Sequence, residues 1–331
     1  MVIIFQSKPS ILATASVVGP LEKRSVFKSY FDTVMDDERV QEKTNEKGHA
    51  LMVNEACKLI VSKAGIKNLD IDYFIGGDLV NQMTPTNFAA RELAVSFIGL
   101  FSACATSVSS VIIASLLTEV GASQLAVAGA SSQHNSVERQ FRYPVDYGAQ
   151  KPATAQWTVT GAGYALIGEH TDDAPFVEAA TVGKVVDFGA TDPFHMGGAM
   201  APAAFDTIQQ HLKGRNQKLT DYDTIMTGDL GQIGLKILKA MFAQSGTPKE
   251  QLQIFRDAGA EYYGEDDSFQ AGASGPGCSA TVYFSYINEQ LKSGRYKRVL
   301  LVATGALLSP LSYQQGETIP CTAHAMEIAM K

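Results

Sequence analysis

The chain has 331 residues, of which 45% are hydrophobic, and this composition is typical of a folded globular protein rather than a disordered one. Its 27 basic and 34 acidic residues give a net charge of −7, and no dense Lys/Arg cluster is present, which argues against a nucleic-acid-binding protein. No segment reaches the ~18 to 20 apolar residues that a membrane span requires, and the first residues do not form a good signal peptide, so we expect neither feature.

The four cysteines stand far apart and form no CxxC or Cys/His pattern at zinc spacing. We therefore expect reduced thiols rather than disulfides, and we expect no metal site and no cofactor. The cysteines are Cys57, Cys104, Cys278 and Cys321.

An amphipathic helix is predicted over residues 49–65, ending near Gly65, and it is followed by DIDYFIGGDLVNQ at 70–82. The same order returns later in the chain, where a helix pattern over 201–214 precedes DYDTIMTGDLGQI at 221–233. At a constant offset of 151 the two stretches share three aspartates, a glycine and a leucine. A helix, an acidic loop, a strand and a Gly-Asp turn therefore occur twice.

The next stretch, 101–131, is matched by 275–306, and the match pairs Cys104 with Cys278. In both stretches a cysteine opens a helix, and a turn leads to an apolar run of strand length. Strands that alternate with helices imply parallel βαβ units. We therefore predict an α/β protein made of two similar halves, residues 1–172 and 173–331.

Cys104 stands where the apolar run of the first half meets the small-residue helix. A thiol at a helix start lies near unpaired backbone N–H groups and the positive end of the helix dipole, which suits a nucleophile. The same position in SACATS also suits a small buried residue, because close packing asks for little volume there. Position alone leaves both interpretations open.

The strand, the SACATS motif, the small-residue helix and the AVAGAS run together resemble the thiolase fold, which thiolases and ketoacyl synthases share. That resemblance implies a layered α/β/α/β/α body. Over essentially the whole length the chain resembles, more specifically, the stage V sporulation protein AD family of endospore-forming bacteria. The stretches that carry this resemblance are 131–163 (with HNSVERQFRYP), AMAPAAFDTI at 199–208, VLLVATGALLSP at 299–310 and IPCTAHA at 319–325.

The resemblance to this family implies a protein that binds dipicolinic acid (pyridine-2,6-dicarboxylate). Such a protein would act with the other stage V sporulation A membrane proteins, which take up calcium dipicolinate in sporulation and release it in germination. Since no span is expected, the chain would lie peripherally on the spore inner membrane. The resemblance leaves open whether calcium enters with the ligand and whether the dimer usual for this fold forms.

Two departures from the thiolase pattern argue against catalysis. In thiolases a His opens H-P-x-G-C-S-G near the second-half cysteine, but this chain reads SGPGCSA, with Ser274 at the position of that His. The late Cys-x-Gly-Gly-Gly turn of thiolases is CTAHA here, which keeps Cys321 and replaces glycines by Ala323, His324 and Ala325. We therefore expect a non-catalytic binding protein. The alternative is an acyltransferase or condensing enzyme of the ketoacyl synthase III or thiolase type with Cys104 as nucleophile.

A long loop is predicted over 131–160, because its second-half counterpart, 307–318, is much shorter. This loop offers guanidinium groups for the carboxylates of the ligand and polar or aromatic groups for its ring. The predicted ligand-binding residues are Cys104, His134, Asn135, Arg139, Arg142, Tyr143, Asp78, Asn81, Gln82, Cys321 and His324. For the arginines the competing interpretation is ion pairing that fixes the loop, and for Asp78 it is a cap on the following turn.

Overall fold

The computed structural model describes residues 1–141 and 150–331, and within them 12 strands form one mixed sheet and two short strands form a separate one. Along the sheet the order is β5-β4-β6-β8-β2-β9-β14-β13-β10-β11. The first-half strands are β2 (Ser10–Val18), β4 (Tyr73–Gly77), β5 (Ser96–Gly99), β6 (Leu125–Ser132) and β8 (Gly161–Gly168). The second-half strands are β9 (Phe176–Val182), β10 (Thr224–Thr227), β11 (Phe255–Asp257), β13 (Arg298–Ala306) and β14 (Cys321–Ala329).

The two halves have the same strand order, running outward from their junction at β2 and β9. In each half the three outer strands are parallel, and the strand next to the junction, β8 or β14, is antiparallel to its neighbours. Four short strands complete the set: β1 (Val2–Ile4), β3 (Thr33–Val34), β7 (Trp157–Thr158) and β12 (Ala273–Ser274). The duplicated α/β architecture predicted from the internal repeat is confirmed.

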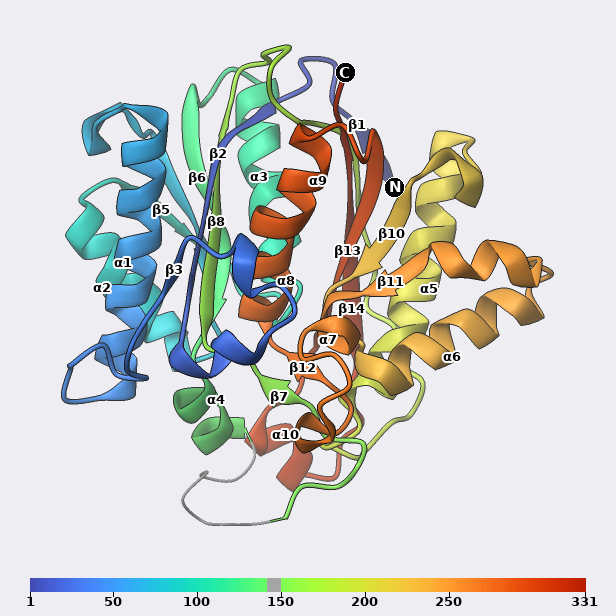
Figure 1. Ribbon diagram of the computed structural model, residues 1–331. Helices are drawn as coiled ribbons and strands as arrows, with labels where there is room; N and C mark the ends of the chain where they lie inside the picture. Colours follow the sequence, from blue (N-terminus) through green and yellow to red (C-terminus); the bar gives the residue numbers. More distant parts are fainter. Residues whose placement is uncertain (142–149) are drawn as a thin grey trace.

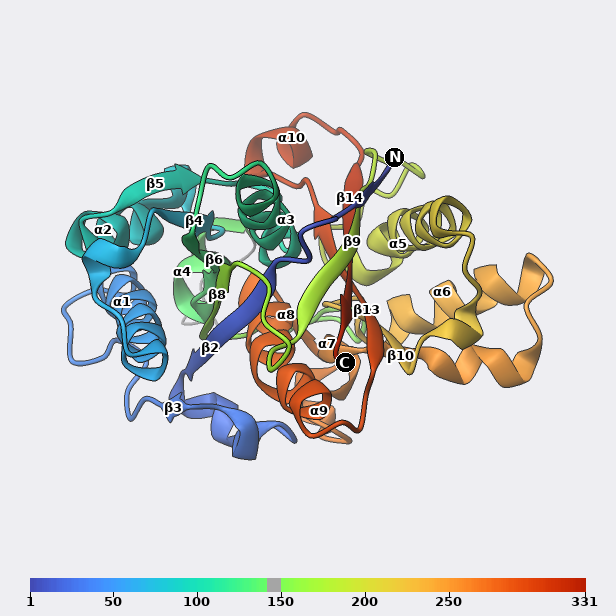
Figure 2. The same ribbon diagram turned by 90° about the horizontal axis from the view of Figure 1, so that it is seen from above.

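Helices lie outside each half of the sheet and between the two halves (Figure 1, Figure 2). The first half is covered by α1 (Asn45–Ala64) and α2 (Thr84–Leu93), and the second by α5 (Met196–Arg215) and α6 (Gly231–Gln244). The central layer holds α3 (Thr106–Glu119) and α8 (Pro276–Val282), which continues into α9 (Asn288–Lys292). The layers therefore alternate helix, sheet, helix, sheet and helix.

The central helix α3 is largely buried because it packs against strands of both halves. Small and apolar side chains make this packing possible, since a helix between two sheets has no free face for bulky polar groups. Cys104 lies two residues before this helix. The helix therefore fixes the position of the cysteine at the boundary between the halves.

Helix α1 begins and ends at residues that favour helix boundaries. Thr44 accepts a hydrogen bond from the Lys47 backbone N–H at the start of the helix. At the end, Gly65 adopts the left-handed conformation with φ of 66°, which a glycine tolerates without strain. The predicted end of this helix is confirmed.

The segment 131–160 is not the continuous loop that we expected. It contains the end of β6, the helix α4 (His134–Phe141) and the strand β7, which pairs with β12 of the second half. Its second-half counterpart, 307–318, also contains a helix, α10 (Pro310–Gln314). Val137 of α4 is buried in a small apolar cluster, and Phe141, four residues later, packs against that cluster.

One further short helix, α7 (Ala258–Glu261), follows β11.

The last strand of the first half ends at Gly168, and the first strand of the second half begins at Phe176. These ends lie on either side of the predicted border at residue 172. In the described parts of the chain, no helix combines the length and the apolar character needed to cross a bilayer.

Candidate functional site

A small cavity of about 40 Å³ lies beside Cys104, at the carboxyl ends of strands from both halves. Its walls are mostly apolar, and the polar side chains among the described lining residues are Cys104, Thr158 and Ser274. Cys104 itself is 7% exposed. The full lining is Leu79, Phe101, Ala103, Cys104, Val137, Phe141, Thr158, Met196, Ser274, Ala306 and Leu308.

The backbone turn before α3 presents the Cys104 side chain to this cavity. Ala103 has φ of 48°, a left-handed conformation that is unfavourable for a residue with a Cβ atom. The turn is held by Thr106, whose hydroxyl donates to the Ala103 carbonyl at 2.7 Å and accepts from the Ser102 N–H at 3.1 Å. Strand β13 can pass close to this turn because residue 305 is glycine, where a Cβ atom would lie 2.4 Å from the Ser102 oxygen.

The carboxylate of Asp229 lies behind the cavity wall and accepts a hydrogen bond from the Cys104 thiol. It also accepts hydrogen bonds from the Gly275 N–H at 3.0 Å and from the Thr304 hydroxyl at 2.9 Å. Burial raises the pKa of Asp229 to about 6, and these three hydrogen bonds oppose that rise. A carboxylate beside the thiol disfavours a second negative charge, so this pair works against a Cys104 thiolate.

Ser274 occupies β12 and is 2% exposed, with its side chain in the cavity lining. The position that the sequence comparison with thiolases singled out therefore does face Cys104. No histidine is present among the described residues that line the cavity. A serine hydroxyl can donate or accept a hydrogen bond but is not a general base near neutral pH.

A polar layer continues from the cavity through Thr158. The Thr158 hydroxyl donates to Glu138 at 3.0 Å, and Glu138 pairs with Lys151 at 3.3 Å. Lys151 also lies over the Trp157 ring, 4.5 Å from its centroid. The predicted ligand residue His134 stacks on the same ring with a centroid distance of 4.0 Å, and its Nδ1 lies 3.0 Å from the Thr158 carbonyl oxygen. His134 thus belongs to this layer rather than to the cavity lining.

Asp78 is fully buried and caps the turn that leads into α2. Its carboxylate accepts hydrogen bonds from the backbone N–H groups of Val80 and Thr86 and from the Thr86 hydroxyl. Asn81 and Gln82, which follow, are exposed. The structure places none of these three predicted ligand residues in the cavity lining, although Leu79 between them does line it.

Arg139 is exposed at the end of α4 and forms an ion pair with Glu46 at the start of α1. Asn135 is half-buried on the same helix, and neither residue lines the Cys104 cavity. The predicted ligand residues Arg142 and Tyr143 lie outside the described residues.

Cys321 and His324 lie on opposite faces of β14, because side chains alternate along a strand. Cys321 packs into the apolar cluster of the second half, and burial together with the Asp187 and Asp229 charges raises its pKa to about 12. His324 accepts a hydrogen bond at Nδ1 from the Gly183 N–H at 3.2 Å, and burial lowers its pKa. Because Nδ1 accepts this hydrogen bond, the proton of the neutral imidazole lies on Nε2. The two side chains do not converge on one site.

Asp229 is the site residue that our sequence analysis missed. It was visible as the partner of Asp78 in the internal repeat, and the hydrogen bonds of Asp78 match the turn-cap interpretation of that residue. The same repeat could not show that the second copy also reaches Cys104, because this contact joins residues 125 positions apart.

The comparisons with known proteins agree with this fold. A family model described as "Stage V sporulation protein AD (SpoVAD)" matches residues 1–329. The chain is 42% identical over 323 residues to "Stage V sporulation protein AD" of Bacillus subtilis (strain 168), covering 98% of this chain and 95% of that protein.

Solved structures with the same fold include 3-oxoacyl-[acyl-carrier-protein] synthase III from Aquifex aeolicus VF5, at a TM-score of 0.59 and 12% identity, covering 97% of this chain and 99% of the other. They also include a variant of OleA from Xanthomonas campestris, at a TM-score of 0.61 and 16% identity, covering 99% of each chain. At such low identity these structures show a thiolase-like fold and not an activity. The match over residues 1–329 and the 42% identity show that this chain belongs to the stage V sporulation protein AD family.

Proposed function

We propose that this chain binds dipicolinic acid at the Cys104 cavity without forming a covalent bond to it, as a component of the spore assembly that moves calcium dipicolinate. The observation that carries the non-catalytic part is the hydrogen bond from the Cys104 thiol to Asp229, combined with a serine at the Ser274 position. The apolar walls and the hydroxyls of Thr158 and Ser274 suit a planar ring with polar substituents.

The cavity must widen to accept this ligand, because 40 Å³ is far below the ~300 Å³ at the small end of ligand pockets. Phe101 is 53% exposed and Phe141 is half-buried, so both lining rings have solvent into which they can turn. Rotation of these two side chains opens the cavity without moving the strands.

In this proposal, Arg139 or Arg142 supplies the positive charge that binds the two carboxylates of dipicolinate. Arg139 is bound to Glu46 only by an ion pair between partly exposed side chains, and such a pair contributes about 0 to 1 kcal/mol. A dicarboxylate can therefore displace Glu46 at low cost. Arginine is suited to this contact because its planar guanidinium binds a carboxylate through two parallel hydrogen bonds.

Titration calorimetry with dipicolinate and benzoate tests the binding. We expect the wild-type chain to bind dipicolinate at least tenfold more tightly than benzoate, and Ala306→Phe, which fills the cavity, to lose dipicolinate binding. Arg139→Ala distinguishes Arg139 from Arg142, because loss of dipicolinate binding in this variant assigns the contact with the ligand carboxylates to Arg139. Equal weak heats for both compounds on all variants would contradict the proposal.

The competing function is acyl transfer with Cys104 as nucleophile, which the position of the cysteine directly before α3 favours. Intact-mass measurement after incubation with an acyl-coenzyme A distinguishes the two functions. We expect no stable adduct. An adduct on the wild-type chain that disappears in Cys104→Ala would establish the enzyme instead.

We further propose that the chain acts on the surface of the spore inner membrane, bound to the other stage V sporulation A proteins. Membership in the stage V sporulation protein AD family supports this location. Alkaline carbonate, which disrupts contacts between proteins and leaves the bilayer intact, is expected to release the chain from isolated inner membranes. Release that requires detergent would contradict a peripheral position.

A further inference from the structure

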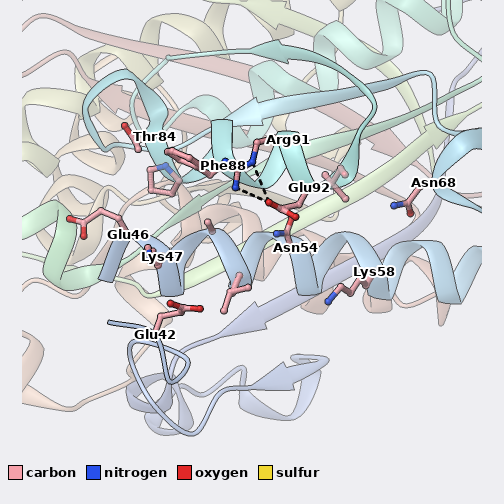
Figure 3. Close-up of a pocket in the computed structure, with 14 residues that line it drawn as sticks. Glu42, Glu46, Lys47, Asn54, Lys58, Asn68, Thr84, Phe88, Arg91 and Glu92 are labelled. Carbon is pink, nitrogen blue, oxygen red and sulfur yellow. Dashed lines mark hydrogen bonds and ion pairs between the residues drawn. The ribbon is translucent and has the colours of Figure 1, made fainter. Parts of the chain in front are cut away.

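A groove of about 700 Å³ runs between α1 and α2 on the outer face of the first half. Figure 3 shows α1 along one side of this groove and α2 along the other, with Asn54 on the side of α1 that faces Arg91 and Glu92 of α2. It shares no described lining residue with the Cys104 cavity. The groove lining is Glu42, Glu46, Lys47, Ala50, Leu51, Asn54, Lys58, Asn68, Thr84, Pro85, Phe88, Arg91, Glu92 and Leu93.

The groove has an apolar floor with an aromatic ring exposed at its side. Leu51, Pro85 and Leu93 supply aliphatic surface, and Phe88 is 48% exposed. The Arg91 guanidinium lies over the Phe88 ring, 4.8 Å from its centroid, and holds that ring in place. A fixed and half-exposed aromatic ring beside aliphatic surface is typical of a contact site for an apolar side chain.

Asn54 lies in the groove, near the middle of α1, and is only 7% exposed. Its Oδ1 is buried and has no hydrogen-bond partner, and within residues 1–141 and 150–331 its side chain makes no hydrogen bond. Most buried amide side chains are hydrogen-bonded, because an unpaired one destabilises the folded chain. The Oδ1 is closed off from the groove, whereas Nδ2 is not among the buried atoms without a partner. Asn54 therefore offers its Nδ2 as a donor to a group bound in the groove.

The dimensions and the hydrogen-bonding groups of the groove fit an extended peptide. From Lys47 to Lys58 the groove follows eleven residues of α1, about 16 Å at 1.5 Å per residue. That length matches about five residues of extended chain at 3.3 Å each. The Asn54 Nδ2 can donate to the C=O of one extended residue, whereas a helical peptide already uses its C=O groups internally.

The charges around the groove balance. Three cationic side chains, Lys47, Lys58 and Arg91, stand against the three acidic side chains Glu42, Glu46 and Glu92. Several are also paired, as Arg91 is with Glu92 and Lys58 with Glu55. A balanced rim offers no net attraction to a phosphate or a polyanion, and it matches a peptide without net charge.

We propose that the α1–α2 groove binds an extended, uncharged peptide segment of a protein partner, with the Asn54 amide hydrogen-bonded to the backbone of one peptide residue and an aliphatic side chain of that peptide packed on Phe88. This site shares no described lining residue with the Cys104 cavity, and Glu46, the ion-pair partner of Arg139, lies at its rim. It gives the chain a surface through which a second protein can attach while the cavity remains accessible.

A heptapeptide library displayed on phage, selected on the full chain, supplies the probe. An enriched peptide is synthesised with a fluorescent label and titrated by anisotropy against wild type, Asn54→Leu and Phe88→Ala. We expect at least a tenfold weaker affinity for both variants, while the melting temperature of Asn54→Leu rises. Phe188→Ala is the matched control, because Phe188 is 71% exposed and lies outside the groove, and it is expected to bind as wild type does.

Two further measurements examine the mode of binding. Replacement of the peptide bond whose C=O faces Asn54 by an ester, which is a weaker acceptor, is expected to reduce affinity at least threefold. Saturating dipicolinate is expected not to displace the peptide. The proposal would be overturned if no peptide were enriched on wild type over Asn54→Leu, or if the two bound the peptide equally. Insensitivity to ester replacement at every position would overturn the backbone contact, and displacement by dipicolinate would assign the peptide to the Cys104 cavity.

Discussion

At the scale of single residues, the environment of Cys104 decides between its two interpretations. The start of a helix favours a thiolate, but the thiol donates its proton toward the buried carboxylate of Asp229. A full charge at hydrogen-bond distance outweighs the partial charge of a helix end, which is about half an elementary charge. The thiol therefore acts as a hydrogen-bond donor in the cavity wall.

Replacing Asp229 by asparagine tests this balance. Without the carboxylate the helix end acts on the sulfur unopposed, so we expect iodoacetamide to alkylate Cys104 about tenfold faster in Asp229→Asn at pH 7.5, since a nearby charge shifts a titration by one unit or more. Peptide mass spectrometry distinguishes alkylation of Cys104 from that of the other cysteines.

The control is Asp78→Asn, because Asp78 occupies the equivalent position in the repeat and does not contact Cys104. This variant is expected to react as wild type does. An unchanged rate in Asp229→Asn would mean that the helix end, and not Asp229, controls the reactivity of Cys104.

At the scale of elements, an equivalent aspartate in each half joins two neighbouring parallel strands. Asp72, before β4, accepts hydrogen bonds from the backbone N–H groups of Gln124 and Leu125 at the start of β6. Asp223, before β10, accepts from the corresponding groups of Lys297 and Arg298 at the start of β13. Each carboxylate thus joins the beginnings of two neighbouring parallel strands that the chain reaches only after a long crossover.

We predict that Asp72→Ala and Asp223→Ala destabilise the chain by similar amounts, about 1 to 2 kcal/mol each. Each variant loses two backbone hydrogen bonds to a charged acceptor, and Asp72→Ala also loses a long one from the Ser123 hydroxyl at 3.4 Å. Partial exposure to water reduces the loss. Urea denaturation measures the free energy of unfolding. Asp36→Ala, at a fully exposed side chain, is the control and is expected to change stability by less than about 0.5 kcal/mol. A large effect at only one of the two positions would show that the repeat is not energetically equivalent.

At the scale of the whole molecule, the internal repeat predicted the architecture because each repeated signal acts within its own half. The aspartates that precede β4 and β10 bond to a neighbouring strand of the same half, and the glycine that ends α1 bonds to the last turn of that helix. The cavity was less predictable, because its contacts are distant in the sequence. Arg139 pairs with Glu46, 93 positions earlier, and Asp229 reaches Cys104 from the other half. Helix α4 was visible in the spacing of Val137 and Phe141, but the length of the segment suggested a loop.

Buried carboxyl groups with opposite pKa shifts also shape the stability of the whole chain. Burial, with the Glu38 charge, raises the pKa of Glu22 to about 8, and burial raises that of Asp257 to about 7. Glu327 behaves in the opposite way. Burial alone would raise its pKa, but hydrogen bonds from His211 and Arg215 outweigh burial and lower it to about 2.

A raised pKa contributes stability that is complete below the unfolded value and is lost as the pH rises through the folded value. Glu22 therefore weakens the fold between about pH 4.5 and 8, and Asp257 does so between about pH 3.8 and 7. A lowered pKa contributes stability that is present above the unfolded value and is lost as the pH falls through the folded value, so Glu327 weakens the fold from about pH 4.5 down to 2. We therefore expect these three groups to give the greatest stability near pH 4.5.

Two variants that replace a carboxyl by an amide test the acid and alkaline sides of this stability profile separately. The free energy of unfolding is measured by urea denaturation at a series of pH values. Glu22→Gln keeps an acceptor for the Thr160 N–H and cannot ionise, so relative to wild type it is expected to gain about 2 kcal/mol or more between pH 5 and pH 8, since each pKa unit corresponds to about 1.4 kcal/mol. Glu327→Gln should lower stability at pH 5 to 8 and flatten the acid limb, because Arg215 loses its buried anionic partner. A wild-type profile that rises steadily from pH 5 to 8 would show that Glu22 is ionised in the folded chain.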